Sequence, residues 1–477
     1  MNTYPKSLLI LLAFILLHCS DNNKPEQANT PISSPMEIKI DSIANDFIDQ
    51  GKIMGLSIAV AQKDEVIYNK SFGFLDTGRT QKVNNDHTFL MASISKLITT
   101  TLAMKLVEEG RLSLDASLYD FLPDFPNQEQ AKKIKLRQLL THTAGLKDYA
   151  DAVDSVYLAT RISPTYDDYY AFFAENELDF EPDTHFNYSN SGFILMAMVI
   201  ERITGKPFQE EIDRIINKPG GLDLKLIAER INTPEMCPYF ELVDTILEPR
   251  PHWPWIKGDG GLTTTAKDLV TFPYKWANEV IISKQSYDAM VTPHKLIDGI
   301  STGYGLGVRT GNFEGEKVIG HTGGNKSTMS IMAYFPEREI SLVVFVNTDN
   351  TPTDALYIEG FVALAALGKE IPVLSEMEIK DENLDRFLGD YKSIDNFYYG
   401  KGNITILKYP DDSHLYRKRT GSESKGTKLF YLGNNTFGYE SFPMDRVIFE
   451  TNNNGEIVAY NNYWNGLRKG SFFRKVD

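Results

Sequence analysis

Cysteine is nearly absent from this sequence of 477 residues, which contains only Cys19 and Cys237. This shortage argues against a framework of structural disulfide bonds. Cysteine and histidine also do not cluster at the spacing of a zinc site. Neither the phosphate-binding pattern G-x-x-x-x-G-K nor the dinucleotide-binding pattern G-x-G-x-x-G is present. The sequence therefore implies no metal and no other cofactor.

Blocks of like charge and internal repeats are absent as well. The net charge of −15 comes from acidic residues spread along the chain, which argues against nucleic acid or an anionic membrane surface as a partner. The hydrophobic content of 42% is sufficient for a large core, and the length favours more than one domain.

The first residues resemble an export signal. Lys6 precedes an apolar run from Leu8 to Leu17, which is shorter than the roughly 20 residues that a membrane-spanning helix needs. Cys19 follows, as in a lipoprotein signal, although His18 departs from the small residue that normally precedes the lipidated cysteine. We expect a signal peptide over residues 1–18, a flexible linker over 19–36, and a lipid-anchored protein on the periplasmic or surface face of a membrane. The alternative is plain secretion into the periplasm or medium.

The rest of the chain divides by pattern into two parts. Residues 37–372 are predicted to form an α/β (α+β) domain, in which helices flank an antiparallel sheet and a large helical insertion separates its strands. Residues 381–477 consist of short, aromatic-rich alternating segments and are predicted to form an antiparallel all-β domain. The patterns that carry these predictions are helices over 37–50, 94–109, 193–203 and 354–367, and strands over 55–61, 66–74, 327–334, 340–346, 404–409, 428–432 and 447–450.

The first candidate motif runs from Ser93 to Lys96 at the start of a predicted helix. Residues three apart share a helix face, so the lysine amine is expected beside the serine hydroxyl. Serine is a weak nucleophile that needs a base in contact, and a lysine serves where burial or nearby cations lower its pKa. The same pattern recurs from Ser422 to Lys425 in a predicted surface turn, so the motif alone is weak evidence.

Two further motifs follow along the chain. Tyr188 and Asn190 precede a predicted helix, where a tyrosine hydroxyl can relay protons. The same spacing at Tyr460 fits a cross-strand aromatic residue instead. The third motif is His321-Thr322-Gly323-Gly324, ahead of a predicted strand; its glycines either let a backbone N–H approach an acyl oxygen or form a tight turn.

The order of the three motifs resembles that of the serine β-lactamase and penicillin-binding-protein superfamily, closest to its class C β-lactamase, carboxypeptidase and esterase branch (peptidase family S12-like). Flanking segments agree with it. Residues 186–193 resemble the family's tyrosine box, 139–146 its leucine-rich threonine and histidine segment, and 260–269 another recurrent stretch. The resemblance spans about 43–367. Residues 388–391 resemble the opening of a small barrel-like domain that is often appended.

The resemblance implies an acyl-enzyme mechanism without a cofactor. Ser93 would attack a carbonyl while Lys96 and Tyr188 manage its proton, and Asn190 would orient the substrate and Lys96. The backbone N–H groups of Ser93 and Gly324 would form the oxyanion hole.

His321 departs from the family pattern, which has a lysine that binds a substrate carboxylate. Histidine is largely neutral at pH 7 and holds a carboxylate less firmly, so we expect hydrolysis of esters or small amides and no efficient hydrolysis of penicillins. With Thr322 and Gly323 it is still expected to contact substrate. His142 and His185 are interpreted as structural hydrogen-bonding residues.

We therefore expect a serine hydrolase acting on a small-molecule or peptide substrate: a carboxypeptidase or D-aminopeptidase, an esterase, or a weak β-lactamase. The alternative from a different class is a non-catalytic envelope protein that uses the cleft or the β domain to hold peptidoglycan or a saccharide. Trp253 and Trp255 either line the cleft or pack a loop.

Overall fold

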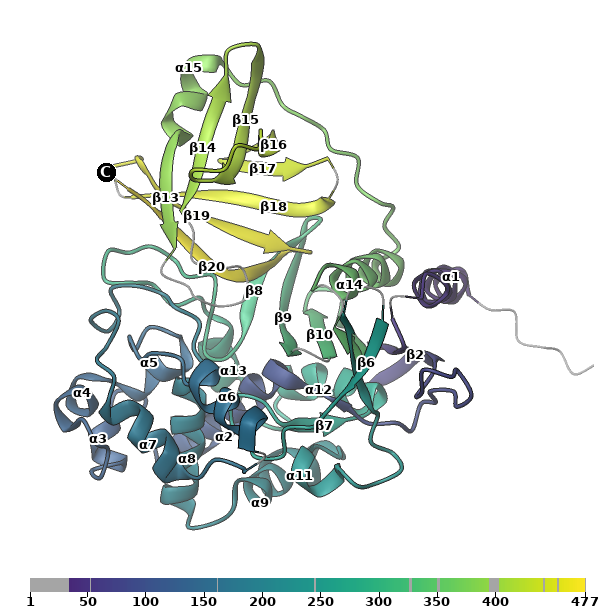
Figure 1. Cartoon of the computed structure of the whole chain (residues 1–477), viewed down its shortest axis with the longest axis vertical. Coiled ribbons are helices and arrows are strands. Elements are labelled where there is room, and N and C mark those ends of the chain that lie inside the picture. Colours follow the sequence, from purple (N-terminus) through teal and green to yellow (C-terminus); the bar gives the residue numbers. More distant parts are fainter. Residues whose placement is uncertain are drawn as a thin grey trace, which may run out of the picture.

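The computed structural model describes residues 34–476 apart from 52, 161, 244–245, 326–327, 350–351, 394–402, 441 and 453. Its centre is a six-stranded antiparallel sheet with the strand order β2-β1-β11-β10-β9-β8 (Figure 1). The two ends of the body thus share one sheet, because β1 pairs with β11. The strands are β1 (Gly55–Gln62), β2 (Glu65–Gly73), β8 (Arg309–Phe313), β9 (Glu316–Asn325), β10 (Thr328–Phe335) and β11 (Ile340–Val346).

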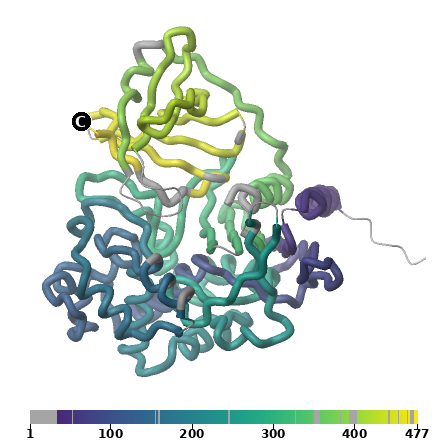
Figure 2. The backbone as a smooth tube through the Cα atoms, in the orientation of Figure 1, coloured from purple at the N-terminus to yellow at the C-terminus, as the bar shows by residue number. Residues whose placement is uncertain are grey.

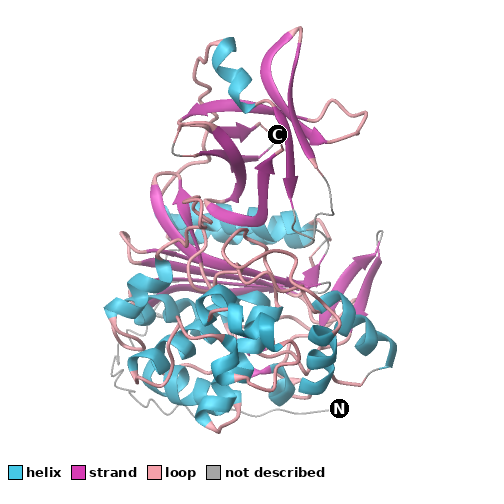
Figure 3. Ribbon diagram, turned by 90° about the vertical axis from the view of Figure 1, so that its left-hand side faces the viewer, coloured by secondary structure: helices cyan, strands magenta, loops and turns pink. Residues whose placement is uncertain are grey.

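Helices cover both faces of this sheet (Figure 3). On one face, α1 (Pro35–Asp49) and α14 (Pro352–Leu367) share a buried cluster with the sheet. On the other, α12 (Ala266–Ala277) and the helical insertion form the largest core. Because neither face meets solvent, β10 and β11 are buried at every position and consist of nearly continuous apolar residues.

The helical insertion surrounds α2 (Ser95–Glu108), which lies against α8 (Ser191–Thr204). The helix α8 ends at Gly205, whose φ of 68° only glycine adopts readily. The other helices of the body are α3 (Leu118–Phe121), α4 (Gln128–Lys133), α5 (Leu136–Leu140), α6 (Ala150–Thr160), α7 (Tyr166–Ala174), α9 (Phe208–Ile212), the π-helical η2 (Asp213–Asn217), α10 (Lys218–Gly220), α11 (Ile227–Arg230) and α13 (Lys284–Val291).

Two small sheets within the body were not predicted from the sequence. One has the order β12-β5-β6 and the other β3-β7-β4. Strands of two to five residues with little alternation give no periodic signal, so the sequence could not reveal them. Their bounds are β3 (Phe89–Leu90), β4 (Lys225–Leu226), β5 (Tyr239–Val243), β6 (Ile246–Arg250), β7 (Leu262–Thr264) and β12 (Thr348–Asp349).

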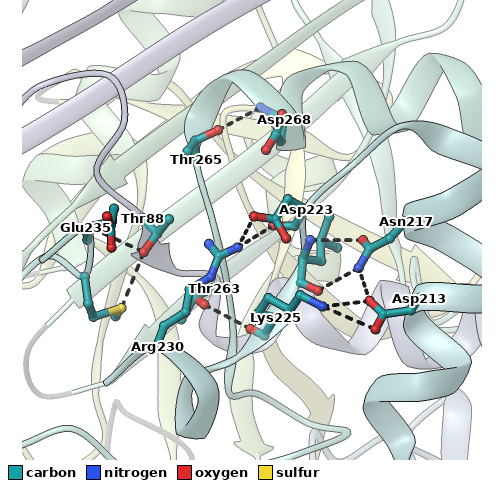
Figure 4. A network of polar contacts seen from close by, with 12 residues as sticks. Thr88, Asp213, Asn217, Asp223, Lys225, Arg230, Glu235, Thr263, Thr265 and Asp268 are labelled. Carbon is teal, nitrogen blue, oxygen red and sulfur yellow. Dashed lines mark hydrogen bonds and ion pairs between the residues drawn. The ribbon is translucent and has the colours of Figure 1, made fainter. Parts of the chain in front are cut away.

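A polar network holds the β3-β7-β4 sheet in place (Figure 4). The Thr263 hydroxyl on β7 donates to the Lys225 carbonyl on β4 at 2.9 Å, and Lys225 Nζ lies 3.0 Å from Asp213 Oδ1. Arg230 and Asp223 form a second ion pair beside it. This sheet matters for the site because β3 leads directly into the Ser93 turn.

The C-terminal part is a closed eight-stranded antiparallel barrel, drawn in light green and yellow in Figure 2. Its first and last strands pair with each other, and Leu384 and Phe387 belong to its core. The barrel confirms the predicted all-β architecture. Its elements are α15 (Asp381–Leu384), η3 (Asp385–Phe387), β13 (Gly389–Ser393), β14 (Ile404–Tyr409), β15 (Asp412–Arg419), β16 (Thr427–Gly433), β17 (Thr436–Tyr439), β18 (Phe442–Thr451), β19 (Ile457–Trp464) and β20 (Leu467–Lys475).

The barrel packs on the body through its last three strands. Ala459 on β19 lies in one buried cluster with Tyr188 and Tyr304 of the body. Arg474 on β20 forms an ion pair with Asp298, the two atoms being 2.8 Å apart.

Some of the sequence predictions fall outside what the structure describes. The predicted signal peptide and Cys19 lie outside the described residues, and the domain boundaries remain predictions. Cys237 is a buried free thiol, and burial raises its pKa to about 12. Within the described ranges, no helix combines the length and apolar character needed to cross a membrane.

Candidate active site

Ser93 lies in the 3₁₀ turn η1 (Ala92–Ile94), which passes directly into α2. This places Lys96 Nζ 3.0 Å from Ser93 Oγ. The same amine contacts Asn190 Oδ1 at 2.7 Å and the Asp259 carbonyl at 2.8 Å, so three acceptors surround it. Lys96 has no exposed surface, and a buried cation is tolerated only with such complete hydrogen bonding.

The backbone just before Ser93 is strained. Ala92 has a φ of +44°, in the left-handed region that costs a non-glycine residue roughly 1–3 kcal/mol. Neighbouring strands hold Met91 on both sides: its N–H donates to the Leu262 carbonyl at 2.7 Å, and its carbonyl accepts from the Ser330 hydroxyl at 2.6 Å. The strain is thus maintained by the β3-β7 pairing and by the central sheet.

Asn190 is oriented by a partly buried carboxylate that the sequence analysis did not single out. Its backbone N–H and its side-chain Nδ2 both donate to Asp148 Oδ2, at 3.0 and 3.1 Å. Because the amide nitrogen faces Asp148, the amide oxygen faces Lys96. Burial raises the pKa of Asp148, while its hydrogen bonds and the nearby Lys96 charge oppose that rise.

Asp259 is a second buried carboxyl group beside Lys96. Its backbone carbonyl accepts from Lys96, while its Oδ2 accepts from the Tyr149 hydroxyl at 2.8 Å. Its other oxygen, Oδ1, has no hydrogen-bond partner among the described groups. Burial raises its pKa to about 6, against the opposing effects of the Lys96 charge and the Tyr149 hydrogen bond.

Tyr188 lies next to the same amine. Lys96 Nζ is 5.0 Å from the centre of the Tyr188 ring, and the Arg309 guanidinium is 5.4 Å from it. His142 lies against this ring, with centroids 4.1 Å apart, and its Nδ1 accepts from the Ser189 N–H at 3.0 Å. Burial and nearby cations keep the pKa of His142 well below its usual value, so it is neutral.

The glycine-rich end of β9 lies beside Ser93. A Cβ atom on Gly323 would stand 2.3 Å from the Met91 carbonyl oxygen and 2.9 Å from the Ser93 nitrogen, so only glycine permits this approach. The pairing of β8 with β9 ends at Arg309 and Gly320, which leaves the following residues of β9 without a β8 partner. Thr322 and Gly324 are partly exposed there.

His321 lies in the core beneath this edge. Its Nδ1 donates to the Thr322 carbonyl at 2.6 Å, and its Nε2 accepts from the Tyr304 hydroxyl at 2.9 Å. Burial, the Arg309 charge and the Lys96 charge hold its pKa well below the usual value. A neutral, fully buried ring with both nitrogens engaged does not present a positive charge to a substrate.

The competing motif matches lie elsewhere. Ser422 and Lys425 are in a turn of the barrel surface, and Tyr460 is in the barrel core. The half-buried His185 contacts the Thr184 hydroxyl through Nδ1. Trp255 packs against the body core and stacks on Trp253 with centroids 5.7 Å apart.

The geometry and the motif order agree with a comparison against known families. The sequence model of the family described as Beta-lactamase matches residues 40–367. The chain belongs to the beta-lactamase family. This establishes the superfamily that the motif order indicated.

Curated relatives and solved structures extend the finding. Penicillin-binding protein 4* of Bacillus subtilis is 26% identical over 310 residues, which cover 61% of this chain and 68% of the relative. The octameric penicillin-binding protein homologue from Pyrococcus abyssi is 25% identical with a TM-score of 0.63, covering 92% of this chain and 99% of that one. A D-amino acid amidase from Ochrobactrum anthropi, 23% identical with a TM-score of 0.61 and covering 70% of this chain and 98% of its own, shares the fold.

Sequence reasoning missed four residues that shape this site. Asp148 and Asp259 stand beside segments whose resemblance to the family was recognised, so their position offered a signal. Arg309 and Tyr304 had none, because only the tertiary structure brings them to Tyr188 and His321. Arg309 pairs with Gly320 of β9, and an isolated bridge joins it to Tyr304.

Proposed function

We propose that this protein is a serine hydrolase that forms an acyl-enzyme on Ser93 and hydrolyses an amide or an ester. The observation that carries the proposal is the 3.0 Å contact between Lys96 Nζ and Ser93 Oγ, within a buried set of acceptors. A nucleophile and a base in contact, with a third group orienting the base, is the arrangement that nucleophilic catalysis requires.

In this mechanism Lys96 first gives up one proton, so that its neutral amine can act as a base. Ser93 Oγ then attacks the carbonyl carbon and its proton passes to that amine. The negative charge that develops on the carbonyl oxygen meets the backbone N–H groups of Ser93 and Gly324, each worth about 10²- to 10³-fold in rate. Tyr188 delivers a proton to the leaving group. Water then attacks the ester carbonyl, Ser93 recovers its proton, and a carboxylic acid leaves.

The substrate class follows from the charge on the β9 edge. A neutral His321, buried beneath that edge, supplies no cation for a substrate carboxylate. Ester and small-amide substrates without a carboxylate at that position are therefore favoured over penicillins.

The test is to treat the purified protein with a fluorophosphonate probe and with a fluorescent penicillin, beside Ser93→Ala, and to identify the labelled residue by mass spectrometry. Labelling of Ser93 by the fluorophosphonate alone is expected. Labelling by both probes would redirect the substrate assignment to carboxypeptidase or β-lactamase chemistry. Absence of Ser93-dependent labelling by either would refute the hydrolase and favour an envelope binding protein.

Export and lipid anchoring through Cys19 are also proposed, on the strength of the Lys6, Leu8–Leu17 and Cys19 pattern alone. Wild-type protein is expected in the membrane fraction and the variant Cys19→Ser in the soluble fraction. An identical distribution of the two would exclude lipidation at this residue.

A further inference from the structure

The inside of the C-terminal barrel contains a cation, Arg417, that has no acidic partner among the residues that the structure describes. Arg417 on β15 is opposite Ile406 on β14, and both Ile406 and Leu415, two residues before Arg417, belong to the barrel core. Because residues two apart share a face of a strand, Arg417 also faces inward. It lies above the Tyr460 and Phe473 rings, 5.9 and 5.7 Å from their centres.

The hydrogen bonds of this guanidinium are far from complete. Its Nε donates to the Tyr460 hydroxyl at 3.2 Å. Among the residues that the structure describes, no carboxylate forms an ion pair with Arg417, and neither terminal nitrogen has a hydrogen-bond acceptor. An unpaired charge inside a protein is costly, and buried charges are ordinarily paired.

Other polar groups share this interior. Tyr439 on β17 interacts electrostatically with Arg417, and its hydroxyl donates to Asn462 Oδ1 on β19. The Asn462 Nδ2 group is buried and has no partner in the described part of the chain. The same interior thus holds a cation, two phenol groups and an unused amide donor, which can bind an anion. It also holds one carboxylate, since Asp445 on β18 interacts electrostatically with Tyr439.

These polar groups lie toward one end of the barrel. Leu384 and Phe387 fill one end of the barrel, whereas Arg417 lies two residues from the end of β15, toward the opposite end. Arg417 and Tyr439 both retain exposed surface although they face inward. The same end carries the β19–β20 turn, where the Gly466 carbonyl packs on Gly311 of β8, so it is the end nearer the body (Figure 1).

We propose that this end of the barrel binds a small organic carboxylate, with its two oxygens on the Arg417 guanidinium and its apolar part against the Tyr460 and Phe473 rings. One planar fork matches one carboxylate bidentately. A single cation among neutral donors and aromatic rings favours a monoanion with an apolar body over phosphate. The site is separate from the Ser93 machinery and does not depend on the proposed hydrolysis.

Benzoate is the probe, and benzamide is its uncharged counterpart of the same shape. Benzoate is expected to bind the wild-type protein in calorimetric titration and to raise its Tm with concentration, while benzamide does neither. Arg417→Met should lose at least about tenfold in benzoate affinity, since a charged hydrogen bond is worth about 1.5 kcal/mol or more. Lys418→Met, which removes the adjacent outward-facing cation, should bind as the wild type does.

Stability without ligand separates a binding role from a structural one. A guanidinium whose role is to bind an anion contributes little to the stability of the ligand-free protein. Arg417→Met should therefore have a Tm equal to or higher than that of the wild type. A lower Tm with an unchanged benzoate response would show that Arg417 is structural and would overturn the proposal, as would absence of benzoate binding to the wild type. Should Arg417→Met fail to fold, Arg417→Lys keeps the charge but loses the fork, and undiminished benzoate affinity in that variant would equally contradict the bidentate site.

Discussion

Replacing Asp259 by asparagine should stabilise the protein at neutral pH. The carboxyl group is buried beside Lys96, with Oδ1 lacking a partner in the described structure, and burial raises its pKa from the ordinary 3.8 to about 6. A tenfold change in proton affinity corresponds to about 1.4 kcal/mol, so keeping this carboxylate ionised in the folded state costs about 3 kcal/mol. Asparagine has the shape of the protonated acid and avoids that cost.

The pH window follows from the sign of the shift. A group whose pKa is raised by folding stabilises the fold below the unfolded pKa, and this contribution is lost as pH rises through the folded value. The Asp259 contribution is therefore complete below about pH 4 and lost above about pH 6. The free energy of unfolding of Asp259→Asn should equal that of the wild type near pH 4 and exceed it by up to about 3 kcal/mol at pH 7 to 8.

Urea unfolding followed by tryptophan fluorescence, at half-unit pH steps from 4 to 8, measures this difference. Asp288→Asn, in an exposed pair with Lys284, is the matched control and should differ from the wild type by no more than about 0.5 kcal/mol throughout. A difference for Asp259→Asn that is flat with pH, or that is negative at pH 7, would refute the reasoning about its burial.

Three further predictions concern the site and its surroundings. Gly323→Ala should lower kcat at least about 100-fold, because the added Cβ would displace β9 from Ser93. Steady-state kinetics measures this effect, and an unchanged kcat would contradict the close approach of Gly323 to Ser93. Asn190→Ala should lower kcat by about 100-fold and lower the free energy of unfolding in urea by about 1–3 kcal/mol, since the Asp148 carboxylate loses a donor. A wild-type kcat together with a wild-type free energy of unfolding would show that Asn190 does not orient Lys96. Ala459→Trp should overpack the cluster around Tyr188, costing about 1–3 kcal/mol and lowering kcat/KM, whereas Glu423→Trp in an exposed turn should change neither.

Much of the architecture was predictable because local patterns determine it. The apolar runs of β10 and β11 and the glycine that ends α8 indicated these elements at nearly their observed bounds. The three-residue spacing of Ser93 and Lys96 required their contact once a helix formed there. The short strands β3, β4 and β7 were missed, since two or three residues carry no periodicity.

The sequence by itself determined the family, the order of its motifs and the separation into a helix-and-sheet body and a β barrel, because these depend on local patterns and on their order along the chain. Only the tertiary structure decided which buried charges meet. Asp148 and Asp259 interact electrostatically with Lys96, and the Arg309 guanidinium lies over the Tyr188 ring. Arg417 pairs with no acidic group in the described structure. Such encounters join residues distant in sequence, and the burial that shifts a pKa or isolates a cation exists only after the elements have packed together.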